Sequence, residues 1–117
     1  MSLKQKQITY NFGLLAERIA SWYLRIKFYQ ILAIRYKSPF GEIDIIAKQR
    51  NKIVFVEVKA RKDTSLMDFI SVRQQRRISR AAEYYLLKHP KYHLYQISFD
   101  AIIMNRFFWP KHFKQCW

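Results

Sequence analysis

The sequence predicts an α/β fold in which a mixed β-sheet is covered by helices. Two segments, residues 11–28 and 71–88, show the three- and four-residue spacing of apolar side chains that is typical of helices. Strongly apolar runs bounded by turn residues predict a strand at 29–37, a hairpin over 42–58 and a strand at 94–104. The expected order is therefore helix, three strands, helix, strand.

The composition predicts one folded domain, residues 1–117, that associates with polyanions. Half of the 117 residues are hydrophobic, which is enough for a single core without a metal or disulfide. A formal net charge of +14 favours nucleic acid, because cationic side chains release counterions from phosphates. Ribosome association, an acidic protein partner and an anionic membrane surface are the alternatives. With one cysteine and no run near the roughly 18 apolar residues of a membrane span, we expect a cytoplasmic protein.

The first helix is expected over residues 11–28. Its apolar side chains recur at helical spacing and define the expected buried face: Leu15, Ile19, Trp22 and Ile26. Glu17 lies on a lane of small residues, because Gly13, Ala20 and Ser21 are three or four positions away. Such a lane would let the helix approach the sheet closely and bring the carboxylate towards the hairpin. The alternative is a solvent-exposed glutamate.

The polar tetrad QRNK joins two apolar runs, EIDIIA and IVFVEV, into the expected hairpin, which follows a turn around Pro39. If the loop is centred on Arg50 and Asn51, the numbers of any two residues that face each other across the strands sum to 101. Asp44 then lies opposite Glu57, and Glu42 lies opposite Lys59. A register shifted by one residue would place the two carboxylates on different faces.

Opposed carboxylates on apolar strands need a compensating charge. Mg²⁺ prefers oxygen ligands and usually binds one or two carboxylates together with water and phosphate, and Lys59 would supply a further positive charge. The alternative is a set of exposed ion pairs, Glu42–Lys59 and Glu57–Lys59, which are common and weak. The chain has only eight Asp and Glu residues, Gly41 precedes the charged strand, and the charges lie in its most apolar region. These observations favour the metal.

Residues 71–88 are expected to form the second helix, with Ser71 and Gln74 at the spacing of a capping box. One face carries arginines at positions i, i+3, i+4 and i+7: Arg73, Arg76, Arg77 and Arg80. The buried face is expected to hold Ile78, Ala82, Tyr85 and Leu86. Because like charges repel and arginines in a first turn oppose the helix dipole, the stripe predicts phosphate binding rather than an ordinary solvated face. Arg61 and Lys62 would extend it.

The final strand, residues 94–104, alternates two sets of side chains: Ile97, Phe99, Ala101 and Ile103 against Ser98, Asp100 and Ile102. The tail RFFWPKHFKQCW then mixes aromatic and basic residues. We expect its aromatic side chains to cap the small core. Stacking on unpaired bases and contact with a membrane interface are the alternatives.

An acid followed about a dozen residues later by E-x-K on the next strand resembles the core of the PD-(D/E)XK nuclease superfamily. Here that core is Asp44, Glu57 and Lys59. More specific segments are Gly13 with Glu17, GEIDIIA, FVEVKAR, AAEYYL, FDAII and WPKHFKQCW. Together they resemble the YraN family of bacterial proteins, from about residue 11 to residue 117.

The resemblance implies a restriction-endonuclease-like αβββαβ core, related to that of archaeal Holliday-junction resolvases. It implies an endonuclease dependent on Mg²⁺ or Mn²⁺ that hydrolyses phosphodiester bonds of structured DNA rather than RNA, and it is compatible with a homodimer. By position, Asp44, Glu57 and the Val58 carbonyl would be metal ligands. Lys59 would orient or activate the attacking water, and Glu17 would complete the site.

The chain departs from the family pattern at the start of the second helix. The family usually has a lysine there, where this chain has Gln74 and Gln75, and the preceding loop KDTSLMDFI has no glycine. Two alternatives to a nuclease therefore stay open. One is a nucleic-acid-binding module of the same fold without cleavage, and the other is a subunit whose basic face meets an acidic protein.

Overall fold

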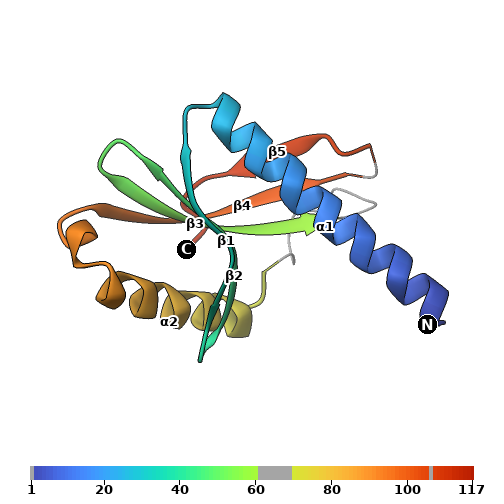
Figure 1. Cartoon of the computed structure of the whole chain (residues 1–117), viewed down its shortest axis with the longest axis horizontal. Coiled ribbons are helices and arrows are strands. Elements are labelled where there is room, and N and C mark those ends of the chain that lie inside the picture. Colours follow the sequence, from blue (N-terminus) through green and yellow to red (C-terminus); the bar gives the residue numbers. More distant parts are fainter. Residues whose placement is uncertain (1, 61–69, 106) are drawn as a thin grey trace.

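A computed structural model of the chain describes residues 2–60, 70–105 and 107–117. These residues form two α-helices, one 3-10 helix and five strands: α1 (Leu3–Ile26), β1 (Gln30–Ser38), β2 (Gly41–Gln49), β3 (Lys52–Ala60), α2 (Val72–Lys88), η1 (Pro90–Tyr92), β4 (Gln96–Met104) and β5 (Pro110–Phe113). The strands make one sheet in the order β1-β2-β3-β4-β5, with β3 and β4 parallel and the other neighbours antiparallel. The predicted mixed sheet and αβββαβ order are confirmed (Figure 1).

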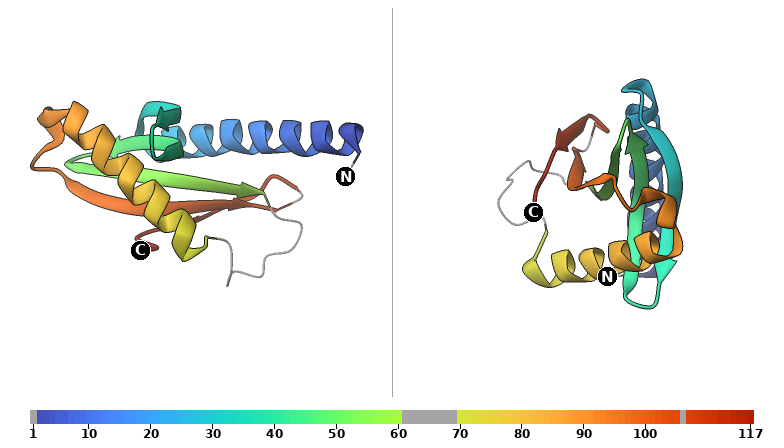
Figure 2. Two further views of the ribbon diagram at one scale, coloured as in Figure 1. Left: turned by 90° about the horizontal axis from the view of Figure 1, so that it is seen from below. Right: turned by 90° about the vertical axis from the view of Figure 1, so that its left-hand side faces the viewer.

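The two long helices cover opposite faces of the sheet, and each closes its own hydrophobic cluster (Figure 2). On one face, Ala16, Ala20 and Leu24 of α1 pack against the sheet. On the other face, Ile78, Ala81, Ala82 and Tyr85 of α2 are buried, and Leu86 is partly buried. The sheet is therefore apolar on both sides, as a mixed sheet flanked by helices requires.

The expected start of the first helix, at residue 11, is wrong. α1 begins at Leu3, where Ser2 and Gln5 form a capping box. The side chains in its first turns are exposed, and this end of the helix projects beyond the sheet (Figure 1). Burial periodicity therefore begins only where α1 meets the sheet, and the cap is the signal that marks the true start.

The expected buried face of α1 is also wrong. Leu15, Trp22 and Ile26 are 43%, 56% and 74% exposed, and only Ile19 of that set packs partly against the core. The buried positions are instead the small residues Ala16, Ala20 and Ser21 together with Leu24. Of the lane predicted around Glu17, Ala20 and Ser21 are buried, whereas an added Cβ at Gly13 would meet nothing within 4 Å, so the expected close approach holds for the later part of the lane only.

The predicted register of the hairpin is confirmed. β2 and β3 pair from Gln49–Lys52 to Ile45–Val56, and each pair sums to 101. Gly41 opens β2 with φ +148°, a backbone conformation that L side chains rarely adopt. A Cβ at this position would lie 3.6 Å from the Cβ of Arg77, so the β1–β2 turn lies directly beside α2.

The final strand, β4, begins at Gln96 rather than at the predicted residue 94, and the two polar side chains of its predicted alternation, Ser98 and Asp100, are buried. Ser98 and Asp100 are 3% and 0% exposed. Asp100 accepts hydrogen bonds from Ser98 Oγ and the Gln115 amide, and it pairs with His112 Nε2 at 2.7 Å. Strand β5, which sequence reasoning missed, carries His112 and adds a fifth strand to the sheet.

The aromatic tail divides between the core and the surface. Trp117 stacks on Phe99 with ring centroids 5.1 Å apart, and its Nε1 donates to Ser79 Oγ. Phe108 packs on Phe12 of α1. Phe107 and Trp109 are instead exposed. The expected capping of the core therefore holds for part of the tail only.

Candidate metal and nucleic-acid site

The site is built where the ladder between β2 and β3 ends. Two residues beyond the last pair, Ile45–Val56, the Val58 amide donates to Asp44 Oδ2 at 2.8 Å. The Asp44 carboxylate thus accepts a hydrogen bond from the neighbouring strand's backbone. This contact fixes the carboxylate beside β3, next to Glu57.

Strand β1 is also irregular at this level. The pairs Ile34–Ile45 and Tyr36–Ile43 leave Arg35 opposite Asp44, and Arg35 has φ +55°. In a regular strand, successive side chains point to opposite faces of the sheet. Ile34 and Arg35 are successive residues of β1, yet both line the same hollow of about 520 Å³ between α1 and β1. The unusual backbone conformation of Arg35 therefore turns its side chain towards α1.

Glu17 is the acid that α1 contributes. Its Oε2 accepts a hydrogen bond from Arg35 Nε at 2.9 Å. Burial raises the pKa of Glu17, and the charge of Asp44 raises it further, while the bond from Arg35 lowers it. The first helix thus brings a carboxyl group into electrostatic contact with Asp44, across the lane of small residues.

Glu57 follows Val56 on β3 and is only 7% exposed. Its Oε1 accepts from Gln74 Nε2 at 3.0 Å and lies 3.6 Å from Lys59 Nζ. Gln74 is therefore a site residue that sequence reasoning missed. The Ser71 side chain does cap the Gln74 amide, as the spacing predicts, but the Gln74 side chain reaches across to the sheet. The family departure at this position was the available signal.

Asp44 and Glu57 form a coupled pair of carboxyl groups. Burial, and then the charge of Glu57, raise the pKa of Asp44 to about 7, against the opposing hydrogen bond from Val58. Burial also raises the pKa of Glu57, and Lys59 is the main opposing influence. Both acids hold a proton more tightly than free acids do because burial disfavours their charged forms, and for Asp44 the negative charge of Glu57 adds to this effect. The pair needs positive charge.

The donor set suits an open Mg²⁺ site rather than a closed metal cage. Within the described residues, no group of three or more His, Cys, Asp or Glu side chains could hold a metal ion alone. Mg²⁺ seldom uses such cages; one or two carboxylates are completed by water and substrate phosphate. Asp44 and Glu57 supply two neighbouring carboxyl groups whose charged forms are disfavoured without a cation, and the Val58 carbonyl adjoins Glu57 in the chain. The residues present therefore fit the ion.

The remaining residues predicted for the site lie in different places. Glu42 is exposed, and its backbone neighbour across the β1–β2 ladder is Lys37. The expected pair of Glu42 with Lys59 is not part of the β2–β3 ladder, which ends at Ile45–Val56. Gly41 lies beside Arg77 of α2. Arg61 and Lys62 lie outside the described residues.

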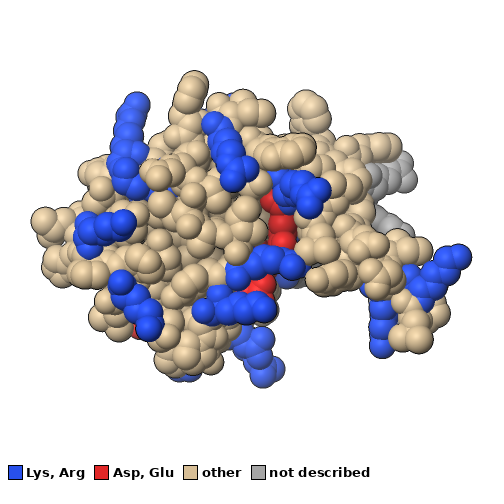
Figure 3. Space-filling model, in the orientation of Figure 1, with Lys and Arg blue, Asp and Glu red and all other residues tan. Residues whose placement is uncertain are grey.

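The predicted arginine stripe is exposed along α2. Its members line a hollow of about 290 Å³ together with Phe40 of the β1–β2 turn: Arg73, Arg76, Arg77 and Arg80. Figure 3 shows acidic side chains on the visible face between the two helices, with Lys and Arg side chains on either side of them. A polyanion lying over this face would therefore meet positive charge beside the acidic side chains that are visible there.

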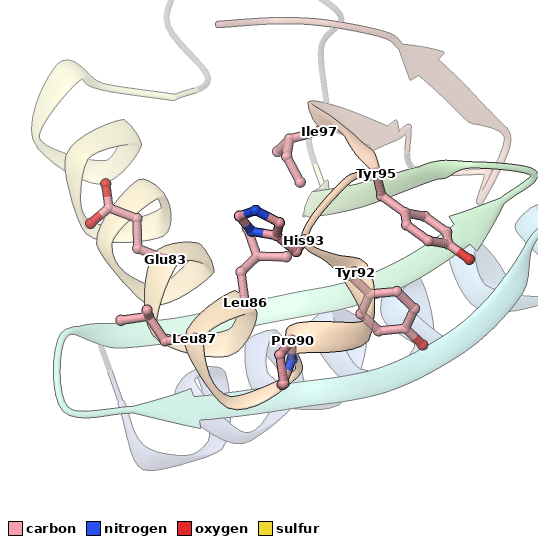
Figure 4. Close-up of a pocket in the computed structure, with 8 residues that line it drawn as sticks. All are labelled: Glu83, Leu86, Leu87, Pro90, Tyr92, His93, Tyr95 and Ile97. Carbon is pink, nitrogen blue, oxygen red and sulfur yellow. The ribbon is translucent and has the colours of Figure 1, made fainter.

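A separate hollow of about 480 Å³ lies at the opposite end of α2 from Gln74. Its wall is mainly apolar and includes Leu86, Leu87, Tyr92 and Ile97, with the Glu83 carboxylate on the helix side (Figure 4). It brings together neither a carboxylate pair nor an acid with a lysine. We therefore place the chemistry at Asp44 and Glu57, and not here.

Comparison with known proteins places the chain in a family. The model of a family described as "Uncharacterised protein family UPF0102" matches residues 16–104, which include Glu17, Asp44, Glu57 and Lys59. A UPF0102 protein of Bartonella tribocorum is 39% identical over 93% of this chain and 85% of its own length. One from Nitrobacter winogradskyi is 41% identical over 88% of each chain. One from Bradyrhizobium diazoefficiens is 43% identical over 92% of this chain and 82% of its own. The chain belongs to the UPF0102 family, which is the YraN family that its motifs resemble.

Proposed function

We propose that the protein is a Mg²⁺-dependent endonuclease that hydrolyses phosphodiester bonds in structured DNA. The observation that carries this proposal is the coupled pair of Asp44 and Glu57 with raised pKa values, beside Lys59. Perturbed pKa values cluster at functional sites, where burial and neighbouring charges tune acids and bases for their task. Mn²⁺ would serve as the alternative ion because it accepts the same oxygen ligands.

Each side chain has a distinct role in this proposal. Asp44 and Glu57 would hold the ion, which would supply positive charge to the scissile phosphate and lower the pKa of the attacking water. The backbone amide of Val58 fixes the orientation of Asp44. Lys59, which lies 3.6 Å from Glu57, stabilises the negative charge that develops on the phosphate or orients the water.

Two further residues position these groups. Arg35 binds Glu17 and holds it near Asp44, so Glu17 acts from α1 on the charge of the site. Gln74 donates to Glu57 and leaves that carboxylate's charge intact, because an amide carries none. The arginines of α2 bind the phosphate backbone and set the position of the substrate.

A nucleic-acid-binding module that does not cleave is the second candidate. The observation that favours it is Gln74, which occupies an oxygen of Glu57 at a position where the family usually has a lysine. Without a lysine there, the site has one fewer positive charge to stabilise the negative charge that develops on the phosphate during cleavage. Both candidates bind nucleic acid, and they differ only in turnover.

A cleavage assay separates the two candidates. Junction, flap, single-stranded and duplex DNA, and RNA, are incubated with the purified protein and either Mg²⁺, Mn²⁺ or a chelator. The nuclease should cleave at least one DNA substrate only with a divalent ion, and Glu57→Gln should abolish that cleavage. Glu42→Gln is the matched control, because Glu42 is an exposed acid of β2 outside the carboxyl pair.

The outcomes have distinct meanings. Equal cleavage by wild type and Glu57→Gln would reveal a contaminating nuclease and end the proposal. Binding without cleavage of any substrate, with either ion, would establish the second candidate. Cleavage that resists the chelator would contradict the role given to the ion.

A further inference from the structure

The hollow between α1 and β1 is lined by arginines and apolar side chains that have no role in the proposed metal site, apart from Arg35. Its volume of about 520 Å³ lies within the range of roughly 300–1,000 Å³ for small-ligand sites. Its apolar lining comes from Leu14, Trp22 and Ile34, and its cations are Arg18, Arg25 and Arg35. Glu17 is the one acid among the lining residues, so the hollow carries net positive charge and favours an anion.

Trp22 lies between two of these cations. Arg18, Trp22 and Arg25 are four and three residues apart on α1, so their side chains follow one lane of the helix. Trp22 is 56% exposed, which leaves an indole face open to a partner. Ser21 accepts a hydrogen bond from Arg25 and draws that guanidinium back along the helix. The lane thus alternates cation, aromatic ring and cation.

This alternation matches a single strand of nucleic acid, in which phosphates and bases alternate. An aromatic ring stacks on the face of any base, and adjacent cations hold its phosphates. In a duplex, both faces of each base are covered by neighbouring bases, so only an unpaired base can reach Trp22.

The hollow adjoins the carboxyl pair through shared residues. Glu17 lines the hollow and also interacts with Asp44, while Arg35 lines it and binds Glu17. The arginine stripe of α2 lies on the other side of the sheet, against the turn that precedes β2.

We propose that this hollow binds an unpaired nucleotide of the substrate strand, with its base on Trp22 and its phosphates against Arg18 and Arg25. The preferred substrate is then a nucleic acid with a single-stranded segment next to the scissile phosphate. The place of the scissile phosphate rests on the proposed function. The binding of an unpaired nucleotide does not, and it can be measured without cleavage.

The test uses fluorescein-labelled single-stranded DNA and a blunt duplex of the same length, with a chelator and fixed salt, and follows fluorescence anisotropy. Trp22→Ala should weaken single-strand binding by about 5- to 150-fold, the equivalent of 1–3 kcal/mol for one stacked base. Duplex binding should change by less than about twofold, because the arginine stripe remains. Trp22→Tyr should retain most of the single-strand affinity. Phe28→Ala is the control, because Phe28 is an exposed aromatic residue that lines neither this hollow nor the neighbouring one that Trp22 shares with Trp109.

Unchanged single-strand binding by Trp22→Ala would overturn the inference. Equal losses of affinity for the single strand and the duplex would also overturn it, as would an equal loss in Phe28→Ala, because neither result would be specific to base stacking on Trp22. Melting temperatures of the variants check that each is folded. If single-strand binding depends on Trp22 but the wild type cleaves nothing, the proposed nuclease activity is refuted and this binding site stands. If the wild type cleaves DNA and neither binding nor cleavage depends on Trp22, the nuclease activity stands and this binding site is refuted.

Discussion

Replacing Asp44 with Asn should stabilise the metal-free protein at alkaline pH while removing its response to Mg²⁺. In the wild type, burial and Glu57 raise the pKa of Asp44 to about 7 from an ordinary value of 3.8. The native state therefore holds this proton more tightly than the unfolded chain does. The stability that this proton gives is fully present below pH 3.8 and is lost as the pH rises through about 7.

The size of the effect follows from the shift in pKa. A difference of about three units, at about 1.4 kcal/mol for each, gives about 4 kcal/mol as an upper bound. Asp44 is partly exposed and shares its proton with Glu57, so about 2 kcal/mol is the expected scale after screening. Asn keeps an oxygen for the Val58 amide and adds an amide that can donate to Glu57, so the variant avoids this loss.

Urea denaturation at pH 5.5 and 8.5, with and without Mg²⁺, measures the free energy of unfolding. We expect Asp44→Asn to exceed the wild type at pH 8.5 by about 2 kcal/mol and at pH 5.5 by about half as much, because the stability is lost progressively between pH 3.8 and about 7. Mg²⁺ at ten times its dissociation constant should add about 1.4 kcal/mol to the wild type and nothing to the variant. The control Glu42→Gln removes the same charge from an exposed position. Equal stability of Asp44→Asn and Glu42→Gln at pH 8.5, or a Mg²⁺ response in Asp44→Asn, would refute this reasoning.

Three further predictions concern the elements that frame the site. Gly41→Ala should destabilise the protein by about 1–3 kcal/mol in urea denaturation, because φ +148° strains any L side chain; an unchanged midpoint would contradict this. His112→Ala should cost about 1–3 kcal/mol by leaving the buried Asp100 carboxylate without its hydrogen bond to His112. The pKa of Asp100 is lowered by His112 and Ser98, so the wild type should lose stability as pH falls below 3.8, and a flat acid profile would argue against this network. Replacing Arg76 and Arg77 with Gln should lower the slope of log affinity for duplex DNA against log salt by about two; an unchanged slope would remove the stripe from the interface.

Patterns local in the chain predicted much of this fold. The hairpin register follows from the two-residue loop and from the period of two in its strands, which together leave one pairing that keeps Asp44 beside Glu57. The arginine stripe of α2 follows from helical spacing alone.

The missed features depend on irregular backbone or on contacts between distant segments. Arg35 reaches Glu17 because of a positive φ inside a strand, and no residue type announces that conformation for an arginine. Gln74 satisfies a capping pattern locally, yet its side chain bonds to Glu57 seventeen residues away in sequence. The exposed face of α1 was misassigned because hydrophobicity favoured Trp22 and Ile26, whereas close packing on the sheet selected alanines.

The most direct test of the central claim is anomalous X-ray scattering from a crystal of the protein soaked in Mn²⁺. We expect a peak in contact with carboxylate oxygens of both Asp44 and Glu57, and no such peak in Asp44→Asn. Mn²⁺ bound at other sites, with no Mn²⁺ peak between Asp44 and Glu57, would show that the carboxyl pair does not hold the ion. The proposed nuclease mechanism would then be refuted.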